Sequence, residues 1–528
     1  MIHKLDNKEI VGSSDVEKES LLFTIIFLLA LLLRVVMFFS IKGIAPDSPN
    51  YIYETQRLID YGFKEFFSQG FAGIFTIYPI FIYLLNLVVD NLLVSAKIVS
   101  LIFGTAVIFP LYLIARKLVG TRAALITAFC FATHPYLIRY SAEILKDTTL
   151  FFFSITALYF AFTGLWKKKY LFFFLAGVFS WITVLVRLYG IVLIFAIPFA
   201  LIVSELKDKR SIKEILINLF LFLVPIPLFG FIFFYIFVGP EKEFVIESFT
   251  NLVLRLDYNA YNDYANSLIN NLPPKVSSDY IELITNHFFI AATAKFFNVF
   301  FTAFTGFLFT LFVAGIYLDR KNIIKDKLRL FIISFSFPFF AFDFGIIFTH
   351  FIITKRQILP LILILLPWSA ISLEAILWWL KERMSTSKKF LRWSSRWIIL
   401  FVFFIWAFST LLYVARPYRE KIIYQEEAGK YIKETAGEGA TILANKYSSR
   451  AIFYAGGKEE YFPAHIVEDS NKFLYKIEVV NPDYIFWDTR IAPLPDSFGE
   501  LEDKGIIEFD KKFVSIRDEV VYIYRVKK

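Results

Sequence analysis

The sequence has a single cysteine and none of the short motifs that mark the common soluble enzyme classes. Cys130 lies inside an apolar run, so the chain cannot form an intramolecular disulfide, and the redox compartment is left open. The patterns HExxH, CxxC, GxSxG and the phosphate-binding P-loop do not occur, which leaves metalloprotease, serine-hydrolase and ATPase interpretations without support. Solenoid repeats, low-complexity tracts and the inverted repeats of transporters are also missing.

Apolar residues dominate what is there. The 528 residues are 57% hydrophobic and 19% aromatic, and the mean hydropathy is +0.59. This is too apolar for a protein whose whole surface meets water, and many runs can cross a hydrocarbon core of about 30 Å. We therefore predict a polytopic α-helical membrane protein. The net charge of +9 is explained by cationic loops that face anionic lipid headgroups, so nucleic-acid binding is not needed to account for it.

About eleven apolar segments are long enough to span the membrane. They are 20–41, 96–115, 121–140, 145–165, 169–186, 188–204, 213–238, 294–318, 328–350, 356–380 and 396–414. The first lacks a small-residue cleavage site, so we expect it to remain as a span. A twelfth segment, 78–91, is short, and we expect it to be interfacial or re-entrant.

Loop charge sets the expected orientation. With the N-terminus in the cytoplasm, the cytoplasmic pieces carry 24 Lys and Arg residues and the short external loops carry eight. Making 78–91 a span would invert the downstream loops and break this asymmetry. We therefore expect a multi-pass protein of the cell (plasma) membrane.

The same topology divides the chain into domains. Residues 1–19 form a cytoplasmic tail and 20–415 a membrane domain, with external loops at 42–95 and 239–293. The second loop has the mixed polar and aromatic pattern of helices lying on a membrane surface. Residues 416–528 read as a small extracytoplasmic α/β domain, with a helix in "YQEEAGKYIKETAG" and strands in "ATILANK", "AIFYAGG", "DYIFWD" and "VVYIYRV".

The first external loop opens with a conspicuous aspartate. Asp47 precedes Ser48 and Pro49, which are typical of the N-cap and first position of a helix, and Gly62 is a natural stop. Glu54 follows Asp47 by two helical turns, so the two share a face with Tyr51 between them. An ordinary role for Asp47 is that of a helix-start acid stabilised by the helix dipole.

Further ionisable residues gather on the predicted outer side. Glu143 and Asp147 are four apart at the junction of two spans, and Arg187 marks the next outer turn. A third outer turn contains His350, Lys355 and Arg356, and Arg34 lies within the first span, where it needs an anion or a polar cavity. The alternatives are a solvated face for the acids, interface anchors for the cations and an interfacial aromatic role for His350.

The order of these features resembles a known family. An external loop with an early aspartate is followed by "YPIFIYLL", the pattern of 96–165, "VRLYG", "KRQILPLILILLPW" and the external "AGKYIKETAGEGATILA". Over nearly its whole length the chain looks like the GT-C glycosyltransferases of the dolichyl-phosphate-mannose-protein mannosyltransferase and aminoarabinose-transferase type. The resemblance implies a GT-C fold and transfer of a sugar, with inversion, from a polyprenyl-phosphate donor on the outer membrane face.

The resemblance also implies roles for particular residues. The catalytic first-loop aspartate of the family corresponds to Asp47, and the outer acid before the fourth span corresponds to Asp147. The conserved basic positions of the family's later outer turns correspond to Arg187 and Arg356. Where the family often has Asp-Glu, this chain has Asp47-Ser48, so protein, lipid and envelope glycan all stay open as acceptors.

The chemistry of such a transfer suits these residue types. Arg187, Lys355 and Arg356 are candidates to bind the donor phosphate, with Arg34 as a deeper alternative. Asp47 is the candidate base for the acceptor hydroxyl, and Asp147 could raise the basicity of Asp47 or bind the acceptor.

Weaker substrate contacts and a metal are also considered. Glu54, Tyr51, Glu143 and His350 are the weaker substrate-binding candidates. No metal site is assigned, and a divalent Mg²⁺ or Mn²⁺ between Asp47 and Asp147 is left as an open alternative.

Two other classes compete with the enzyme. A transporter or flippase for lipid-linked sugars would also need external and intramembrane charges. A scaffold protein whose tail binds a partner predicts that Asp47, Asp147 and the outer arginines do not converge. The expected partners of the enzyme are the polyprenyl-phosphate sugar, the bilayer and a protein or lipid/glycan acceptor.

Overall fold

The computed structural model describes residues 13–68, 76–233, 287–350, 353–385, 389–445, 448–456, 458–462, 470–490 and 493–527. The chain forms two compact units. The helical unit comprises Met1–Val35, Glu54–Ala142 and Lys146–Tyr413, and the α/β unit comprises Val36–Tyr53, Glu143–Leu145 and Val414–Lys528. The predicted surface helices of 239–293 lie outside the described residues up to position 286.

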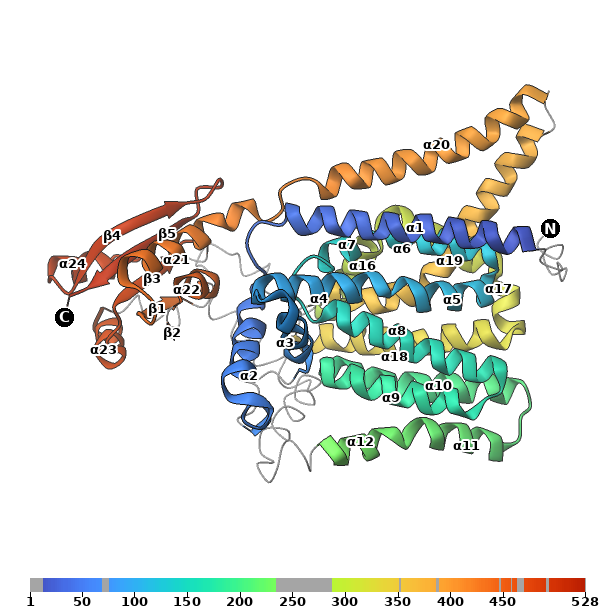
Figure 1. Cartoon of the computed structure of the whole chain (residues 1–528), viewed down its shortest axis with the longest axis horizontal. Helices are drawn as coiled ribbons and strands as arrows, with labels where there is room; N and C mark the ends of the chain where they lie inside the picture. Colours follow the sequence, from blue (N-terminus) through green and yellow to red (C-terminus); the bar gives the residue numbers. More distant parts are fainter. Residues whose placement is uncertain are drawn as a thin grey trace. The chain divides into compact units, whose positions relative to one another are not determined.

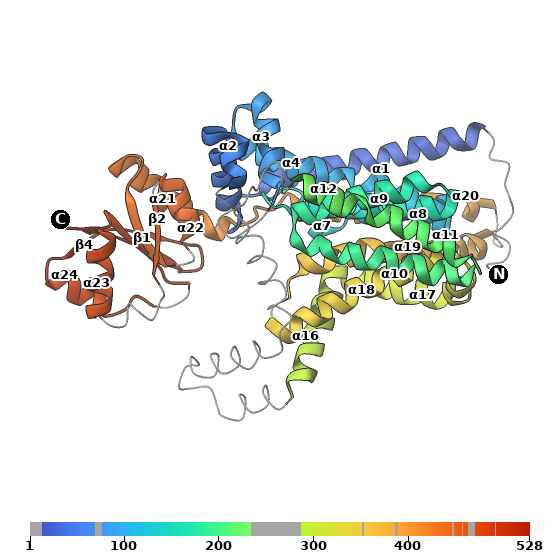
Figure 2. The same cartoon turned by 90° about the horizontal axis from the view of Figure 1, so that it is seen from below.

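Helices make up nearly all of the helical unit (Figure 1). In its first half they are α1 (Ser13–Ser40), α2 (Ser48–Ser68), α3 (Tyr78–Val89), α4 (Leu92–Ala106), α5 (Ile108–Val119), α6 (Thr121–Ala132), α7 (Pro135–Tyr140), α8 (Asp147–Lys167) and α9 (Tyr170–Val186). A 3₁₀ turn, Leu188–Ile191, leads to α10 (Val192–Lys207), α11 (Ile212–Leu223), α12 (Pro225–Phe233), α16 (Phe288–Phe304), α17 (Gly306–Lys325), α18 (Lys327–His350), α19 (Lys355–Ser385) and α20 (Lys389–Val414). Helix α8 packs against α9, α10 against α18, and α17 against α19 (Figure 2).

The structure confirms a multi-pass helical membrane protein but gives a lower number of spans than predicted. In the described residues, seven helices are long and apolar enough to cross a membrane, or eight if one bent pair counts as a span. The predicted segments 121–140, 169–186 and 396–414 instead contain shorter apolar helices: Thr121–Ala132, Tyr170–Val186 and Leu400–Val414. Segment 78–91 contains only the 12-residue α3.

Two local breaks explain part of the difference. Helix α6 ends before His134, which is extended (φ −72°, ψ 117°) because the following Pro135 disfavours helical backbone at the residue before it. The predicted spanning segment 294–318 contains a break, so the two helices there form a broken span or a re-entrant loop. Helices α16 and α17 meet at 99° because Thr305 adopts φ +63° and ψ 132°, a conformation that no helix contains.

Helix α2 begins at Ser48 as predicted but passes the predicted stop. Gly62 is non-helical (φ 77°, ψ 177°) and kinks the helix, which then continues to Ser68. A glycine accepts this positive φ at little cost, so the chain bends there and does not end. The Ser48 hydroxyl donates to the carbonyl of Ile144 at 3.1 Å, a tertiary contact within the α/β unit that the capping pattern does not reveal.

The α/β unit contains a five-stranded mixed sheet. Its strands are β1 (Thr441–Asn445), β2 (Lys458–Phe462), β3 (Tyr484–Asp488), β4 (Ile507–Val514) and β5 (Val520–Val526), in the order β2-β1-β3-β5-β4. Strand β1 pairs in parallel with β2 and β3, whereas β5 pairs antiparallel with β3 and β4.

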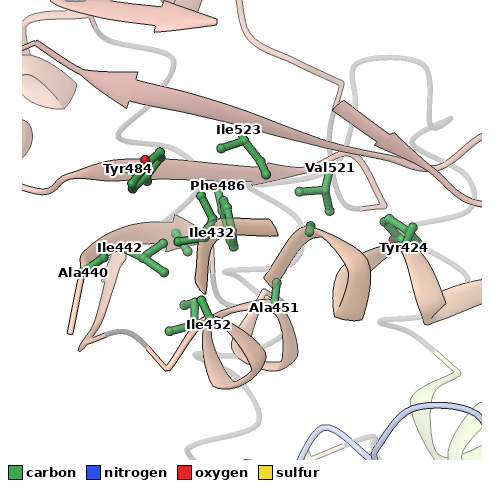
Figure 3. Close-up of a cluster of buried hydrophobic side chains, with 13 residues drawn as sticks. Tyr424, Ile432, Ala440, Ile442, Ala451, Ile452, Tyr484, Phe486, Val521 and Ile523 are labelled. Carbon is green, nitrogen blue, oxygen red and sulfur yellow. The ribbon is translucent and has the colours of Figure 1, made fainter. Parts of the chain in front are cut away.

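Helices cover both faces of this sheet. Alternate residues such as Ile442 and Phe486 pack under α21 (Ile423–Ala436) and α22 (Ser449–Ala455), as Figure 3 shows. Their neighbours Leu443 and Ile485 face the opposite way, toward α23 (Ser470–Val480) and α24 (Ser497–Asp503). Side chains alternate between the two faces along each strand, so each face of the sheet has its own hydrophobic core.

The predicted helix of this region and three of its four predicted strands are confirmed. The fourth, "AIFYAGG", is wrong: it lies in α22, where Ala451, Ile452 and Ala455 are buried with helical spacing. Strands β2 and β4 were not predicted. They are the two edge strands, and edge strands carry charged residues, as in "KEEYF" and "IEFDKKFV", that hide the alternation.

The contact between α17 and α19 depends on one small residue. A Cβ added at Gly315 would lie 1.8 Å from the Trp368 carbonyl oxygen, whereas a Cβ at Gly345 of α18 would meet nothing within 4 Å. We predict that Gly315→Ala destabilises the helical unit by about 1–3 kcal/mol because the two helices must separate. Thermal unfolding of the purified protein in detergent measures this. Gly345→Ala is the matched control, and an equal effect of both changes would contradict the prediction.

Candidate active site

Two arginines lie near the buried carboxylate of Asp147 in the helical unit. This residue begins α8, and its side chain is 1% exposed. Arg187 Nη1 lies 2.5 Å from Asp147 Oδ1, and Arg356 Nη1 lies 3.9 Å from Asp147 Oδ2. The structure thus brings together three predicted site residues that come from the ends of α8, α9 and α19.

Arg187 reaches Asp147 because of how α9 ends. Its backbone is extended (φ −158°, ψ 132°), although its N–H still donates to the carbonyl of Thr183. The chain then turns tightly, and a Cβ on Gly190 would lie 2.6 Å from the Thr183 carbonyl carbon. Only glycine allows so close an approach, so Gly190 fixes the direction in which Arg187 leaves the helix.

The beginning of α3 secures the same end of α9. The Thr76 hydroxyl donates to the carbonyl of Val186 at 2.7 Å, and the Ile77 N–H donates to the carbonyl of Leu185 at 2.9 Å. These bonds satisfy two of the carbonyls that every helix leaves open at its C-terminus. The last turn before Arg187 is therefore held by a second segment.

Helix α19 has two cationic residues in its first turn, a position at which the helix dipole disfavours positive charge. Thr354 precedes the helix, and its N–H and hydroxyl both donate to Gln357 Oε1, at 2.7 and 3.0 Å. Lys355 and Arg356 occupy the first turn, where the positive end of the helix dipole repels them. Lys355 also donates to the Tyr136 hydroxyl and lies 4.3 Å from that ring's centroid. An anion at this helix start would relieve the repulsion.

A second buried carboxylate adjoins the cluster and was not predicted. The Tyr189 hydroxyl lies 2.9 Å from Asp343 Oδ1 and 3.2 Å from the Gln357 carbonyl oxygen, and Asp343 is fully buried. Arg187 also interacts electrostatically with Asp343. A carboxylate inside the phenylalanine-rich run of α18 is costly without a role, and that was the available sequence signal.

Arg34 contacts other residues of the helical unit. Its side chain is completely buried, Nε donates to Ser141 Oγ at 3.2 Å, and Nη1 donates to the Ala30 carbonyl at 3.0 Å. The guanidinium carbon also lies 4.7 Å from the centroid of Phe131. Its third nitrogen, Nη2, is buried without a hydrogen-bond partner among the described residues, and the role of Arg34 as a deeper site for the donor phosphate stays a prediction.

Asp47 lies in the α/β unit, in the turn before α2, and is half-buried. The segment ahead of it joins the chain that follows α20: the Lys42 N–H donates to the Tyr418 carbonyl at 2.8 Å, and the Tyr418 N–H donates to the Ser40 carbonyl at 3.0 Å. Glu143 of the same unit is buried and pairs with Arg419, with Nη2 at 3.0 Å from Oε2. The loop that carries Asp47 is thus part of the α/β unit.

The remaining predicted residues occupy less informative positions. Tyr51 is buried in α2. Glu54 is buried too and pairs with Arg57 at 3.2 Å; burial raises the pKa of the Glu54 carboxyl, and Arg57 opposes the rise. His350 ends α18, and its side chain lies outside what the structure describes.

A metal does not fit the described part of the site. Across the described residues, no three His, Cys, Asp or Glu side chains gather closely enough to hold an ion. The two oxygens of Asp147 face Arg187 and Arg356, so a cation bound there would have to displace an arginine.

Comparisons with known proteins agree with this architecture. The crystal structure of the Archaeoglobus fulgidus oligosaccharyltransferase in complex with Zn and sulfate is similar with a TM-score of 0.60 and 14% identity, covering 95% of this chain and 72% of that one. ArnT from Cupriavidus metallidurans bound to undecaprenyl phosphate is similar with a TM-score of 0.54 and 14% identity, covering 95% of this chain and 97% of that one. At such identities the likeness shows the fold. No curated protein matches the sequence.

One part of the sequence matches a family model. Residues 76–232 match the model of the family described as dolichyl-phosphate-mannose-protein mannosyltransferase. This range contains Asp147, Arg187 and the helices that hold them together. Residues 76–232 are therefore similar to the dolichyl-phosphate-mannose-protein mannosyltransferase family, and the chain has a fold similar to that of ArnT.

Proposed function

We propose that this glycosyltransferase moves a sugar from a polyprenyl-phosphate donor to a hydroxyl or amine acceptor, with inversion at the anomeric carbon. One observation carries the proposal: the buried carboxylate of Asp147 lies close to Arg187, at the end of α9, and to Arg356, at the start of α19. With Lys355 and Asp343, the cluster has three cations and two carboxylates. The excess positive charge and the open N–H groups of the helix start suit a phosphate.

The proposed reaction is one displacement. An acceptor oxygen or nitrogen attacks the anomeric carbon on the face opposite the phosphate, and its new bond forms as the bond from that carbon to the phosphate oxygen breaks. Polyprenyl phosphate leaves with the electron pair, and Arg187, Lys355 and Arg356 stabilise the charge that develops on it. The acceptor proton passes to Asp47, which we propose as the base.

We also propose the orientation and domain roles. The predicted cytoplasmic pieces carry the excess of Lys and Arg, which supports a cytoplasmic N-terminus. In this orientation the starts of α8 and α19 would lie on the outer side. The short helices α6 and α9 and the apolar part of α20, Leu400–Val414, would then complete about eleven crossings. Residues 416–528 would lie outside the cytoplasm. Protein, lipid and envelope glycan are the candidate acceptors.

The base assignment is testable by one isosteric change. We predict that Asp47→Asn lowers transfer from a radiolabelled polyprenyl-phosphate sugar by roughly 10²–10⁴-fold, because the amide cannot accept the acceptor proton. Asp60→Asn is the control, since Asp60 is exposed on α2 and its Oδ1 accepts a hydrogen bond from Gln56 Nε2 at 2.8 Å. Equal activity of Asp47→Asn and wild type would contradict the assignment. No transfer by the wild type from any polyprenyl-phosphate sugar would contradict the function.

Single and double variants of Asp147 and Arg187 distinguish the effect of this ion pair on stability from its effect on sugar transfer. Arg187→Gln leaves a buried carboxylate with a more distant cation, so we predict a loss of about 3–5 kcal/mol in stability. Adding Asp147→Asn removes the stranded charge and restores most of that stability. Transfer stays low in the double variant because the phosphate has lost its arginine. Recovery of both stability and transfer would assign the pair a structural role alone.

We infer that Glu143 is a positioning residue and not a substrate ligand. Its buried pair with Arg419 lies next to Ile144, whose carbonyl accepts from Ser48, the residue after Asp47. We predict that Glu143→Gln lowers kcat roughly tenfold with little change in the donor KM, because a small displacement of a base is costly.

A charge reversal controls this prediction. The double change Glu143→Arg with Arg419→Glu should recover part of the lost kcat, since the pair is restored. Glu508→Gln removes an exposed pair with Lys527 (3.3 Å) in the same unit and should have no effect. An unchanged kcat in Glu143→Gln, or a loss seen only in the donor KM, would contradict the positioning role.

A further inference from the structure

A polar pocket lies at the end of the helices opposite Asp147. It has a volume of about 370 Å³ and is formed where α8 turns into α9 and α10 turns into α11. Its polar lining includes Lys168, Lys209, Arg210, Ser211, Glu214 and Asn218. Helix α9 begins beside this pocket and ends at Arg187, so about 25 Å of helix separates the two sites. Figure 1 shows α9, α10 and α11 side by side, in agreement with their packing.

Two of the pocket's lysines occupy strained backbone positions. Lys168 has φ +54° and Lys209 has φ +53°, the left-handed region that glycine and asparagine adopt at lower cost. In the described part of the chain, neither lysine has an acidic partner. Lysine at both turns therefore places two positive charges, neither in an ion pair among the described residues, in the lining of one pocket, at a cost in backbone free energy.

The floor of the pocket contains polar atoms that are buried and unsatisfied. Arg210 bonds to Glu205 Oε1 at 3.2 Å, but its Nη2 has no partner among the described residues. Asn218 is 1% exposed and donates to the same Glu205 oxygen at 2.9 Å, while its Oδ1 has no partner there either. A buried donor and a buried acceptor that lack partners are costly, and a ligand with an anionic oxygen and a hydroxyl or ammonium group would satisfy both.

Apolar surface flanks the pocket on the neighbouring helices. Leu171 of α9 and Ile212 and Leu216 of α11 are 64%, 72% and 59% exposed. In a membrane span, such side chains face acyl chains. A ligand with a charged polar head and hydrocarbon tails could therefore place its head in the pocket and its tails along α9 and α11.

We propose that this pocket binds the phosphate headgroup of a membrane phospholipid. Lys168, Lys209 and Arg210 Nη2 contact the phosphate, and Asn218 Oδ1 accepts from the hydroxyl or amine of the headgroup. The acids nearby leave this charge available: Asp208 pairs with Lys327 at 2.6 Å, and Glu205 and Glu214 lie 3.2 and 3.9 Å from Arg210. The site is separate from the donor site and does not rest on the proposed function.

The experiment compares lipid retention by matched variants. Purified full-length protein in detergent is titrated with phosphatidylglycerol, and bound lipid is counted by native mass spectrometry. The test variant is Lys168→Gln with Lys209→Gln. The control is Lys321→Gln with Lys325→Gln, which removes the same charge from exposed positions near the end of α17. That end lies on the same side, since the adjoining Lys327 pairs with Asp208.

We expect the wild type and the control to retain one tightly bound phosphatidylglycerol and the test variant to bind it at least fivefold more weakly. Equal binding by the test variant and the wild type would overturn the proposal. An equal loss in the control would also overturn it, because general surface charge would then explain the binding. Displacement of the lipid by millimolar inorganic phosphate would overturn the lipid assignment in favour of free phosphate.

Discussion

In the helical unit, the negative charge of one buried carboxylate must be balanced by nearby cations. Asp147 begins a long apolar helix with a side chain that is 1% exposed, so its charge must be balanced by the protein. Arg187 provides that balance only because α9 stops one residue earlier and Gly190 permits a close turn. The same carboxylate faces Arg356 of α19. One acid therefore joins three helix ends that are far apart in the sequence.

The second organising feature is the composite α/β unit. Three separate stretches of chain contribute to it: the loop with Asp47, the short Glu143–Leu145 segment and everything after Val414. Backbone bonds between the Ser40–Lys42 stretch and Tyr418, and the ion pair of Glu143 with Arg419, hold these stretches together. The C-terminal sheet thus shares a unit with the loop that carries the proposed base.

The sequence predicted the membrane class, the helical first half and the gathering of Asp147, Arg187 and Arg356. These follow from hydropathy, loop charge and family resemblance, which act over whole segments. The bend at Thr305 and the α22 helix depend on local backbone and packing that a window of hydropathy averages away. Asp343 was hidden in a phenylalanine-rich run, and the burial of Arg34 against Ser141 and Phe131 is a tertiary contact between distant segments.

The central claim is that the cations around Asp147 hold the phosphate of a lipid donor. Binding of a polyprenyl phosphate to the purified wild-type protein, compared with the uncharged polyprenol of the same chain length, measures this most directly. The account predicts that the phosphate binds at least an order of magnitude more tightly than the alcohol, because charge-assisted bonds to arginine are lost with the phosphate. Equal affinities would show that only the hydrocarbon chain is recognised and would contradict the account.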